Sequence, residues 1–192
     1  VMGQSGSGKT TLLHCLAGIL PPTAGQVIFN GNDISALSDH ERTKLRRTQF
    51  GFVFQFDQLI PELTSEENVA IPLLLNGQNR KTALATAREW LTLVGLPEVA
   101  GKRSSELSGG QAQRVSIARA MAINPTVLFA DEPTGSLDSL NGEKVMEIFL
   151  DTVRSRGTTL VIVTHEPRIA AYADREIIVR DGLVAGRQGV LR

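Results

Sequence analysis

The stretch Gly3-Gln-Ser-Gly-Ser-Gly-Lys-Thr10 decides the fold, because it matches the pattern G-x-x-x-x-G-K-[ST] at every fixed position. The apolar pair Val1-Met2 precedes it and indicates the end of a buried strand, and a helix is predicted from Lys9 to Leu20, ending at Pro21-Pro22. Glycines allow a tight turn that directs successive N–H groups inward, and the helix start adds unpaired amides and a positive dipole end. A loop of this kind is typical of binding to a phosphate chain.

The charged and hydroxyl residues of this loop predict how a nucleotide would be held. Lys9 supplies a full positive charge for the β- and γ-phosphates, and the Thr10 hydroxyl is a candidate ligand of Mg²⁺. The residues predicted to contact the nucleotide here are Gly3, Gln4, Ser5, Gly6, Ser7, Gly8, Lys9, Thr10 and Thr11. The alternative is a flexible Gly/Ser linker, but with glycine near 7% of residues a chance match in this length is on the order of one in a hundred. The sequence therefore predicts a nucleotide site.

Two adjacent carboxylates, Asp131 and Glu132, follow the apolar run Val127–Ala130, which is predicted to be a buried strand. In open α/β sheets ligands bind at the carboxyl ends of the strands. Asp131 suits a role in holding Mg²⁺ through its water shell, and Glu132 could polarise an attacking water as a general base. In isolation the pair would more simply be a turn-capping Asp beside a solvated Glu. Together with the phosphate loop, the pair indicates catalysis.

Strands and helices alternate along the rest of the chain. Strands are predicted at 26–29, 50–54, 126–130, 158–164 and 176–180, and helices after Ser38 and Thr64 and at 80–94, 108–123, 139–155 and 166–173. The spacings Ser38-x-x-Glu41 and Thr64-x-x-Glu67 are capping-box signals. The basic side chains after Ser38 are expected on a solvated helix face; they are Arg42, Lys44, Arg46 and Arg47. The pattern predicts an α/β fold whose sheet is mostly parallel, with helices on both faces.

The composition excludes several classes of protein. The chain has 192 residues, 42% hydrophobic and 21% charged, which suits a single globular domain. Its formal net charge is zero, so the basic excess typical of nucleic-acid binding is missing, and we expect no nucleic-acid partner. The single cysteine, Cys15, excludes a disulfide framework and a multi-cysteine zinc site, and it indicates a reducing compartment. The longest apolar stretch, Val69–Leu75, is far shorter than the roughly 20 residues that span a bilayer.

One pentapeptide, Leu107-Ser-Gly-Gly-Gln111, narrows the family. Ser108 is a good N-cap, and the two glycines leave backbone amides open to an anion, although an ordinary capped helix could begin in the same way. The pentapeptide resembles the signature of the ATP-binding cassette (ABC) ATPases, and the other elements of that family follow in the expected order. Gln55 matches the Q-loop, Ser136-Leu-Asp138 the D-loop, and His165 the H-loop.

The resemblance covers essentially the whole chain and implies a fold, a cofactor and an activity. It implies a P-loop NTPase (RecA-like) core from residues 1–58 and 124–192, with an inserted α-helical subdomain at 59–123, that binds ATP and Mg²⁺ and hydrolyses ATP. The catalytic residues it implies are Lys9, Glu132 and His165. Further nucleotide contacts are implied at Gln55, Ser108, Gly109, Gly110 and Gln111, and metal contacts at Thr10, Gln55 and Asp131.

The sequences at residues 37–47 and 60–73 resemble those of the macrolide-exporter and lipoprotein-release group of ABC ATPases. That resemblance implies a homodimer or paired ATPase subunits, a transmembrane permease, and a cytoplasmic position on the inner face of the membrane. The departures from the pattern, Ala112 and Gln4, remove no group that the chemistry needs. Because family members have strands and an adenine-stacking aromatic residue before the phosphate loop, we expect those N-terminal strands to be missing from this chain.

Other kinds of protein share some of these motifs. DNA-repair and chromosome-maintenance ATPases insert long coiled coils or zinc modules between the phosphate loop and the signature, whereas about 100 ordinary residues separate them here. Ribosome-associated members carry two cassettes in one chain. A catalytically inactive binding module is disfavoured because Glu132 and His165 are both present. The transported substrate is not encoded in this chain, since the transport path of such systems lies in another polypeptide.

Overall fold

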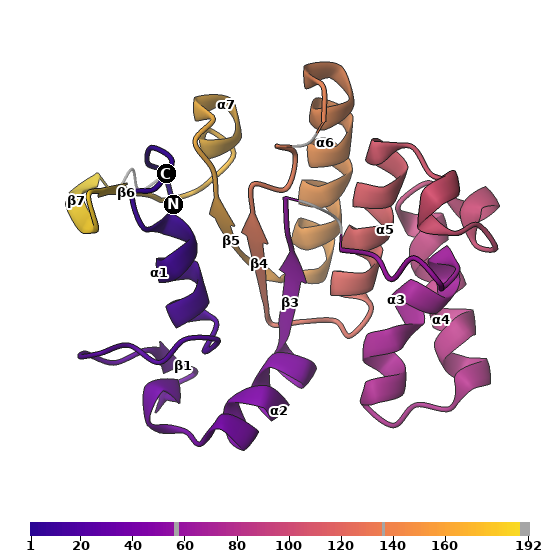
Figure 1. Ribbon diagram of the computed structural model, residues 1–192, viewed down its shortest axis with the longest axis horizontal. Coiled ribbons are helices and arrows are strands. Elements are labelled where there is room, and N and C mark those ends of the chain that lie inside the picture. Colours follow the sequence, from indigo (N-terminus) through magenta and orange to yellow (C-terminus); the bar gives the residue numbers. More distant parts are fainter. Residues whose placement is uncertain (56–57, 136, 189–192) are drawn as a thin grey trace. The chain divides into compact units, whose positions relative to one another are not determined.

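The computed structural model of the chain describes residues 1–55, 58–135 and 137–188, and Figure 1 shows the course of the chain. The helices are α1 (Lys9–Leu16), α2 (Asp39–Gln49), α3 (Ser65–Leu75), α4 (Arg80–Leu93), α5 (Gly109–Met121), α6 (Ser139–Arg156) and α7 (Pro167–Ala170), with 3-10 turns η1 (Ile34–Ala36), η2 (Pro97–Val99) and η3 (Ser104–Glu106). The strands are β1 (Ile28–Phe29), β2 (Asn32–Asp33), β3 (Phe50–Val53), β4 (Val127–Asp131), β5 (Thr159–Val163), β6 (Glu176–Arg180) and β7 (Leu183–Gln188).

Two compact units make up the chain. The first contains Val1–Lys44 and Val161–Arg192, and the second contains Leu45–Leu160. The predicted helical subdomain at residues 59–123 lies within the second unit, and its boundaries stay a prediction. In the described ranges, no helix combines the length and the hydropathy needed to cross a bilayer.

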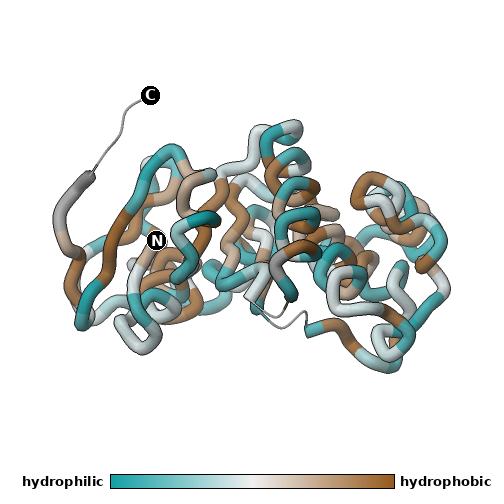
Figure 2. The backbone as a smooth tube through the Cα atoms, turned by 90° about the horizontal axis from the view of Figure 1, so that it is seen from above, coloured by the Kyte–Doolittle hydropathy of each residue, from teal (hydrophilic) through white to brown (hydrophobic). Residues whose placement is uncertain are grey.

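Strands β3, β4 and β5 form one sheet in which β4 lies between β3 and β5 (Figure 1). Strands β3 and β4 are parallel, and their register pairs Phe50 with Val127 and Val53 with Ala130. The middle of β4 is fully apolar and buried, as expected for a parallel strand covered on both faces. Helix α5 lies against β3 so closely that a Cβ on Gly51 would lie 2.6 Å from the carbonyl oxygen of Ala120. Along the helices, hydrophobic and hydrophilic segments alternate (Figure 2), which is the pattern of helices with one buried face.

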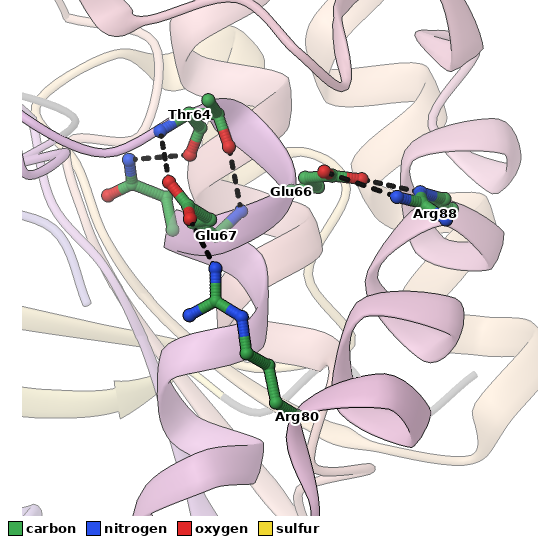
Figure 3. Close-up of polar contacts among 6 residues, drawn as sticks. Thr64, Glu66, Glu67, Arg80 and Arg88 are labelled. Atoms are coloured by element: carbon green, nitrogen blue, oxygen red, sulfur yellow. Dashed lines mark hydrogen bonds and ion pairs between the residues drawn. The ribbon is translucent and has the colours of Figure 1, made fainter.

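Helices α3 and α4 form a pair whose ends the sequence specifies. Thr64 and Glu67 form the predicted capping box at the start of α3, and Glu67 also accepts a hydrogen bond from Arg80 of α4 at 2.8 Å (Figure 3). A second ion pair joins the same two helices, between Glu66 of α3 and Arg88 of α4 (Figure 3). Exposed ion pairs stabilise little, so buried side chains such as Trp90 of α4, which is 3% exposed, dominate the packing of these helices.

In the first unit, Val1 and Met2 extend between two strands. Met2 forms parallel bridges with Thr164 and Ile178, and Val179 N donates to the Met2 carbonyl at 2.7 Å. The predicted strand entry into the phosphate loop is therefore present in the backbone hydrogen bonds. Beside it, β6 and β7 form an antiparallel hairpin.

Three features of the fold differ from the sequence-based expectations. Helix α1 ends at Leu16 rather than Leu20, because Gly18 adopts a left-handed φ of 64° and its N–H bonds back to Cys15. Strand β7 was not predicted, although the Asp181-Gly182 turn is a hairpin signal. The side chain of Arg42 is only 14% exposed and donates to the Leu37 carbonyl at 2.6 Å, so this residue is not on a solvated face.

Candidate nucleotide-binding site

The phosphate loop has the backbone geometry that its glycines predict. Gly6 and Gly8 have φ values of 77° and 98°, in the left-handed region that only glycine adopts at no steric cost. Gly8 is the N-cap of α1 and no side chain caps the helix there, so the positive dipole end of α1 lies at the phosphate loop. Lys9 is 7% exposed, and its Nζ donates to the Gln4 carbonyl at 2.8 Å, which folds the ammonium group over the loop.

Close packing beneath the loop explains why glycine is needed at its start. A Cβ on Gly3 would lie 2.2 Å from the Val179 carbonyl oxygen and 2.7 Å from the Ser7 hydroxyl. The Ser7 hydroxyl is buried and has no hydrogen-bond partner in the described part of the chain. Because a buried hydroxyl without a partner is costly, this oxygen fits a role as a contact to a bound phosphate.

The turn of the β6–β7 hairpin supports the loop from outside. Gly182 N donates to the Ser7 carbonyl at 3.0 Å, and a Cβ on Gly8 would come within 3.8 Å of the Gly182 Cα. No sequence motif described above predicts this support, but the Asp181-Gly182 dipeptide between Arg180 and Leu183 is a signal for the hairpin that provides it.

His165 follows the end of a strand that lies beside the start of the phosphate loop. Met2 and Thr164 pair in parallel, so Gly3 and His165 follow neighbouring chain segments at the same edge. The Glu166 N–H donates to the Thr164 hydroxyl at 3.0 Å, which turns the chain directly after the histidine. The His165 residue is exposed at this edge, as a γ-phosphate contact would need to be. Within the first unit, the structure therefore brings together the phosphate loop and His165.

In the second unit, three predicted residues gather at the carboxyl ends of β3 and β4. The last pair of the parallel register is Val53 with Ala130, so Phe54-Gln55 and Asp131-Glu132 directly follow that pair at the same edge of the sheet. Asp131 is the last residue of β4, and Glu132 follows it with a φ of 46°. The Gln55 side chain reaches the turn after Glu132, because a Cβ on Gly135 would lie 3.1 Å from its Nε2 atom.

Oxygen ligands of the kind that Mg²⁺ prefers stand at this edge, namely the Asp131 carboxylate and the Gln55 amide oxygen. No cluster of three His, Cys, Asp or Glu side chains that could hold a metal occurs in residues 1–55, 58–135 and 137–188. Mg²⁺ usually binds through one or two carboxylates plus substrate phosphates and water, so it does not need such a cluster. The donor set at this edge therefore fits Mg²⁺ bound together with a nucleotide.

The signature pentapeptide forms a capped helix start. Ser108 is the N-cap of α5, its hydroxyl accepts from the Gln111 N–H at 3.3 Å, and the Gln111 side chain accepts from the Ser108 N–H at 3.0 Å. Ser108 and Gly109 are exposed. A Cβ on Gly109 would lie 3.3 Å from the Leu137 side chain, so the signature is packed beside the predicted D-loop.

Asp138, the last residue of the predicted D-loop, is the N-cap of α6. Its carboxylate accepts from the Asn141 side chain at 2.7 Å and from the Asn141 N–H at 3.1 Å. These two hydrogen bonds hold the pKa of Asp138 below its usual range. Ser136, which the sequence analysis also placed in this loop, lies outside the described residues.

The candidate residues thus form two groups, one in each unit. The first holds the phosphate loop and His165, and the second holds the signature with Gln55, Asp131 and Glu132. Thr10 and Thr11 are both exposed at the start of α1.

Comparison with known proteins agrees with this geometry. The model of the ABC transporter family matches residues 1–135, a segment that begins before the phosphate loop and ends after Asp131 and Glu132. The chain belongs to the ABC transporter ATP-binding cassettes. As a member of this family, it is an ATP-binding and ATP-hydrolysing domain with the P-loop NTPase fold.

Two solved structures of the ATP-binding cassette MJ0796 have the same fold as this cassette. One is a dimeric post-hydrolysis state bound to ADP and Pi, with 41% sequence identity and a TM-score of 0.88. The other is a dimeric structure of MJ0796 described as a bacterial ABC transporter cassette, with 42% identity and a TM-score of 0.88. Each match covers 98% of this chain and 83% of the MJ0796 chain.

Proposed function

We propose that this cassette works as one of a pair that encloses ATP between two subunits and drives a membrane permease. The observation that carries the proposal is the exposed start of α5, where Ser108 and Gly109 face solvent with the helix amides behind them. A helix N-terminus of this kind binds anions. The dimeric state of the similar MJ0796 cassettes supports pairing of two such surfaces with two phosphate loops. The partner is a second copy of this chain or a related ATPase subunit.

The side chains divide the work on the nucleotide as follows. Lys9 and the amides at Gly6 and Gly8 hold the β- and γ-phosphates, and the signature of the partner subunit contacts the γ-phosphate from the other side. Mg²⁺ would be held by the oxygens of Thr10, Gln55 and Asp131, and it would supply positive charge that offsets the negative charge of the phosphates.

Two residues act on the attacking water and the terminal phosphate. Glu132 accepts a proton from the water, and His165 donates a hydrogen bond to the γ-phosphate oxygens. The position of Gln55 beside the turn after Glu132 supports a role in placing that water. The neighbouring nucleotide contacts are Gly3, Gln4, Ser5, Ser7, Thr11, Gly110 and Gln111.

Transport requires a second polypeptide. In our proposal the cassette lies on the cytoplasmic face of the membrane and is bound there by a transmembrane permease, of the export or lipoprotein-release type that residues 60–73 resemble. ATP binding closes the dimer and hydrolysis releases it, so the nucleotide acts as a switch on the permease.

A complementation experiment tests the shared site. Lys9→Ala and Ser108→Arg each inactivate a homodimer, because both of its sites then lack either the phosphate-binding charge or an open signature. In a mixed dimer both defects fall on one site and the other site is intact. If the sites turn over independently, an equimolar mixture recovers about a quarter of wild-type ATPase activity, since half of the dimers are mixed and each has one good site.

The control is Ser155→Arg, which introduces the same side chain at an exposed position near the end of α6 and keeps wild-type turnover. Some dimers need both sites, so the two mutant chains are also linked covalently and tested for trapping of nucleotide with orthovanadate. Trapping by the linked wild-type pair and none by the linked mutant pair would show that the site is not shared between subunits.

A further inference from the structure

Two side chains of α5 hold the two ends of the segment that contains Gln55. Gln113 Nε2 donates to the carbonyl oxygen of Phe54 at 3.3 Å, directly before Gln55. Six residues further along α5, Arg119 Nη1 donates to the carbonyl oxygen of Gln58 at 2.9 Å. The same helix therefore starts at the signature and reaches the backbone on both sides of the residue that we assign to Mg²⁺ and the lytic water.

Burial makes the Gln113 contact specific. Gln113 is 1% exposed on a helix face whose neighbouring side chains are mostly apolar, so its amide has no access to solvent. A buried amide destabilises the fold unless it is hydrogen-bonded. A methionine of similar length would fill the same volume without this requirement. The structure therefore keeps a polar group in the core at a position where an apolar one would fit, and its partner is the residue before Gln55.

The far end of the segment is held in an unfavourable backbone conformation. Gln58 has a φ of 47°, in the left-handed region that residues other than glycine rarely adopt. Arg119 binds the carbonyl of this same residue. Such conformations persist when the surrounding structure fixes them, and they cluster at functional sites.

A second contact fixes the Gln55 side chain from the catalytic side. The Gly135 N–H donates to the Glu132 carbonyl at 2.9 Å, and the Gln55 amide lies against Gly135. Gln55 is thus enclosed between the turn that follows the proposed general base and the backbone held by Gln113.

We propose that Gln113 is a positioning residue, supported by Arg119, that fixes the Gln55 backbone to the signature helix so that α5 and Gln55 shift together. The inference rests on the proposed function of Gln55 and names the side chain through which a movement of the signature reaches it. Gln113 does not touch the nucleotide and acts only through Gln55.

The kinetic test uses Gln113→Met in the full chain. Losing one ordinary hydrogen bond of about 1 kcal/mol lowers kcat about fivefold, while the KM for ATP stays within about twofold because the phosphate loop is untouched. The matched control is Thr158→Val, which removes a side-chain bond to the Pro125 carbonyl of 2.9 Å at the opposite end of β4 from Asp131. Thr158→Val is expected to lose stability but keep wild-type kcat.

A double-mutant cycle separates positioning from a general loss of stability. If Gln113 acts through Gln55, then Gln113→Met in a Gln55→Ala background lowers kcat by less than about twofold. The same fivefold loss in both backgrounds would overturn the inference. A Gln55→Ala variant with wild-type kcat would overturn both the inference and the proposed role of Gln55.

Hydrogen exchange gives a readout that does not depend on turnover. Gln113→Met raises the exchange rate of the peptide that contains Gln55 and Gln58, whereas Thr158→Val leaves that peptide unchanged. Equal exchange in wild type and Gln113→Met would refute the contact even in a protein without measurable ATPase activity. Absence of ATP hydrolysis by the wild-type chain together with the predicted change in exchange would refute the proposed function and leave the contact supported.

Discussion

The backbone at Glu132 leads to a prediction that separates stability from catalysis. Glu132 has a φ of 46°, which is unfavourable for any residue with a Cβ atom. Replacing it with glycine removes this strain, whereas replacing it with alanine removes the same carboxylate and keeps the strain. We therefore expect Glu132→Gly to be more stable than Glu132→Ala, the reverse of the usual order of these two residues.

The size of the difference follows from two opposing effects. Left-handed backbone costs a residue with a Cβ about 1–2 kcal/mol relative to glycine. Glycine has a more flexible unfolded chain, which costs about 0.4–1 kcal/mol relative to alanine. The glycine variant should therefore be more stable by about 0.5–1 kcal/mol. For a chain of 192 residues this raises the melting temperature by roughly 1–4 °C over the alanine variant.

Thermal unfolding of the two variants, measured without nucleotide, tests the strain. Glu132→Gln serves as the third variant, because it keeps the side-chain shape and the backbone strain but cannot accept the proton. It should bind ATP and lose about 10²–10⁴-fold in turnover. Equal or greater stability of Glu132→Ala would refute the strain argument. Near-normal hydrolysis by Glu132→Gln would separately refute the role of Glu132 as general base.

Three other predictions follow from close contacts and from one cap. Gly51→Ala places a methyl group 2.6 Å from the Ala120 carbonyl, and overpacking of this kind should lower the free energy of unfolding in a urea titration by about 1–3 kcal/mol. Gly3→Ala, whose Cβ would lie 2.2 Å from the Val179 carbonyl, should displace the phosphate loop and weaken ATP binding more than tenfold in a calorimetric titration, an order-of-magnitude expectation for a misplaced site. Because the pKa of Asp138 is lowered, the stability that its helix cap contributes is fully present above the ordinary aspartate pKa of about 3.9 and is lost as pH falls through the lowered value. The difference in urea midpoint between wild type and Asp138→Ala should therefore be largest near neutral pH and shrink in acid.

Local signals in the sequence predicted most of the helices and strands and the residues that cap the helices. The predicted capping boxes at Ser38 and Thr64 form, and Ser108 is the predicted N-cap of α5, because each depends on residues only three positions apart. Buried strand β4 was predicted because parallel strands covered on both faces are continuously apolar. The fold class followed from these elements together with the phosphate-loop pattern, and it was confirmed by the match to the ABC transporter family.

Errors arose where a stronger signal hid a weaker one. The two prolines after Leu20 marked the obvious end of α1, but Gly18 ends the helix earlier by adopting a left-handed conformation. The charge of Arg42 suggested solvent, although a guanidinium group can be covered when its aliphatic stem packs and its nitrogens bind carbonyls. In both cases the deciding contact involves backbone atoms, which the pattern of side chains does not display.

The residues of the candidate site differ in how clearly the sequence reveals them. Phosphate binding needs a strand, a glycine turn and a helix start within about ten residues, so the sequence shows it directly. Positioning of Gln55 instead depends on Gln113, a residue 58 places away on the signature helix that would be assigned to the surface by its polarity. A buried amide can be told from an exposed one only by its partner, and here the partner is the carbonyl of Phe54. Side chains that bind nucleotide therefore appear in short motifs. The side chains that position them hydrogen-bond to backbone atoms, which every residue has. These positioning residues are therefore recognised only once the packing of helix against strand is known.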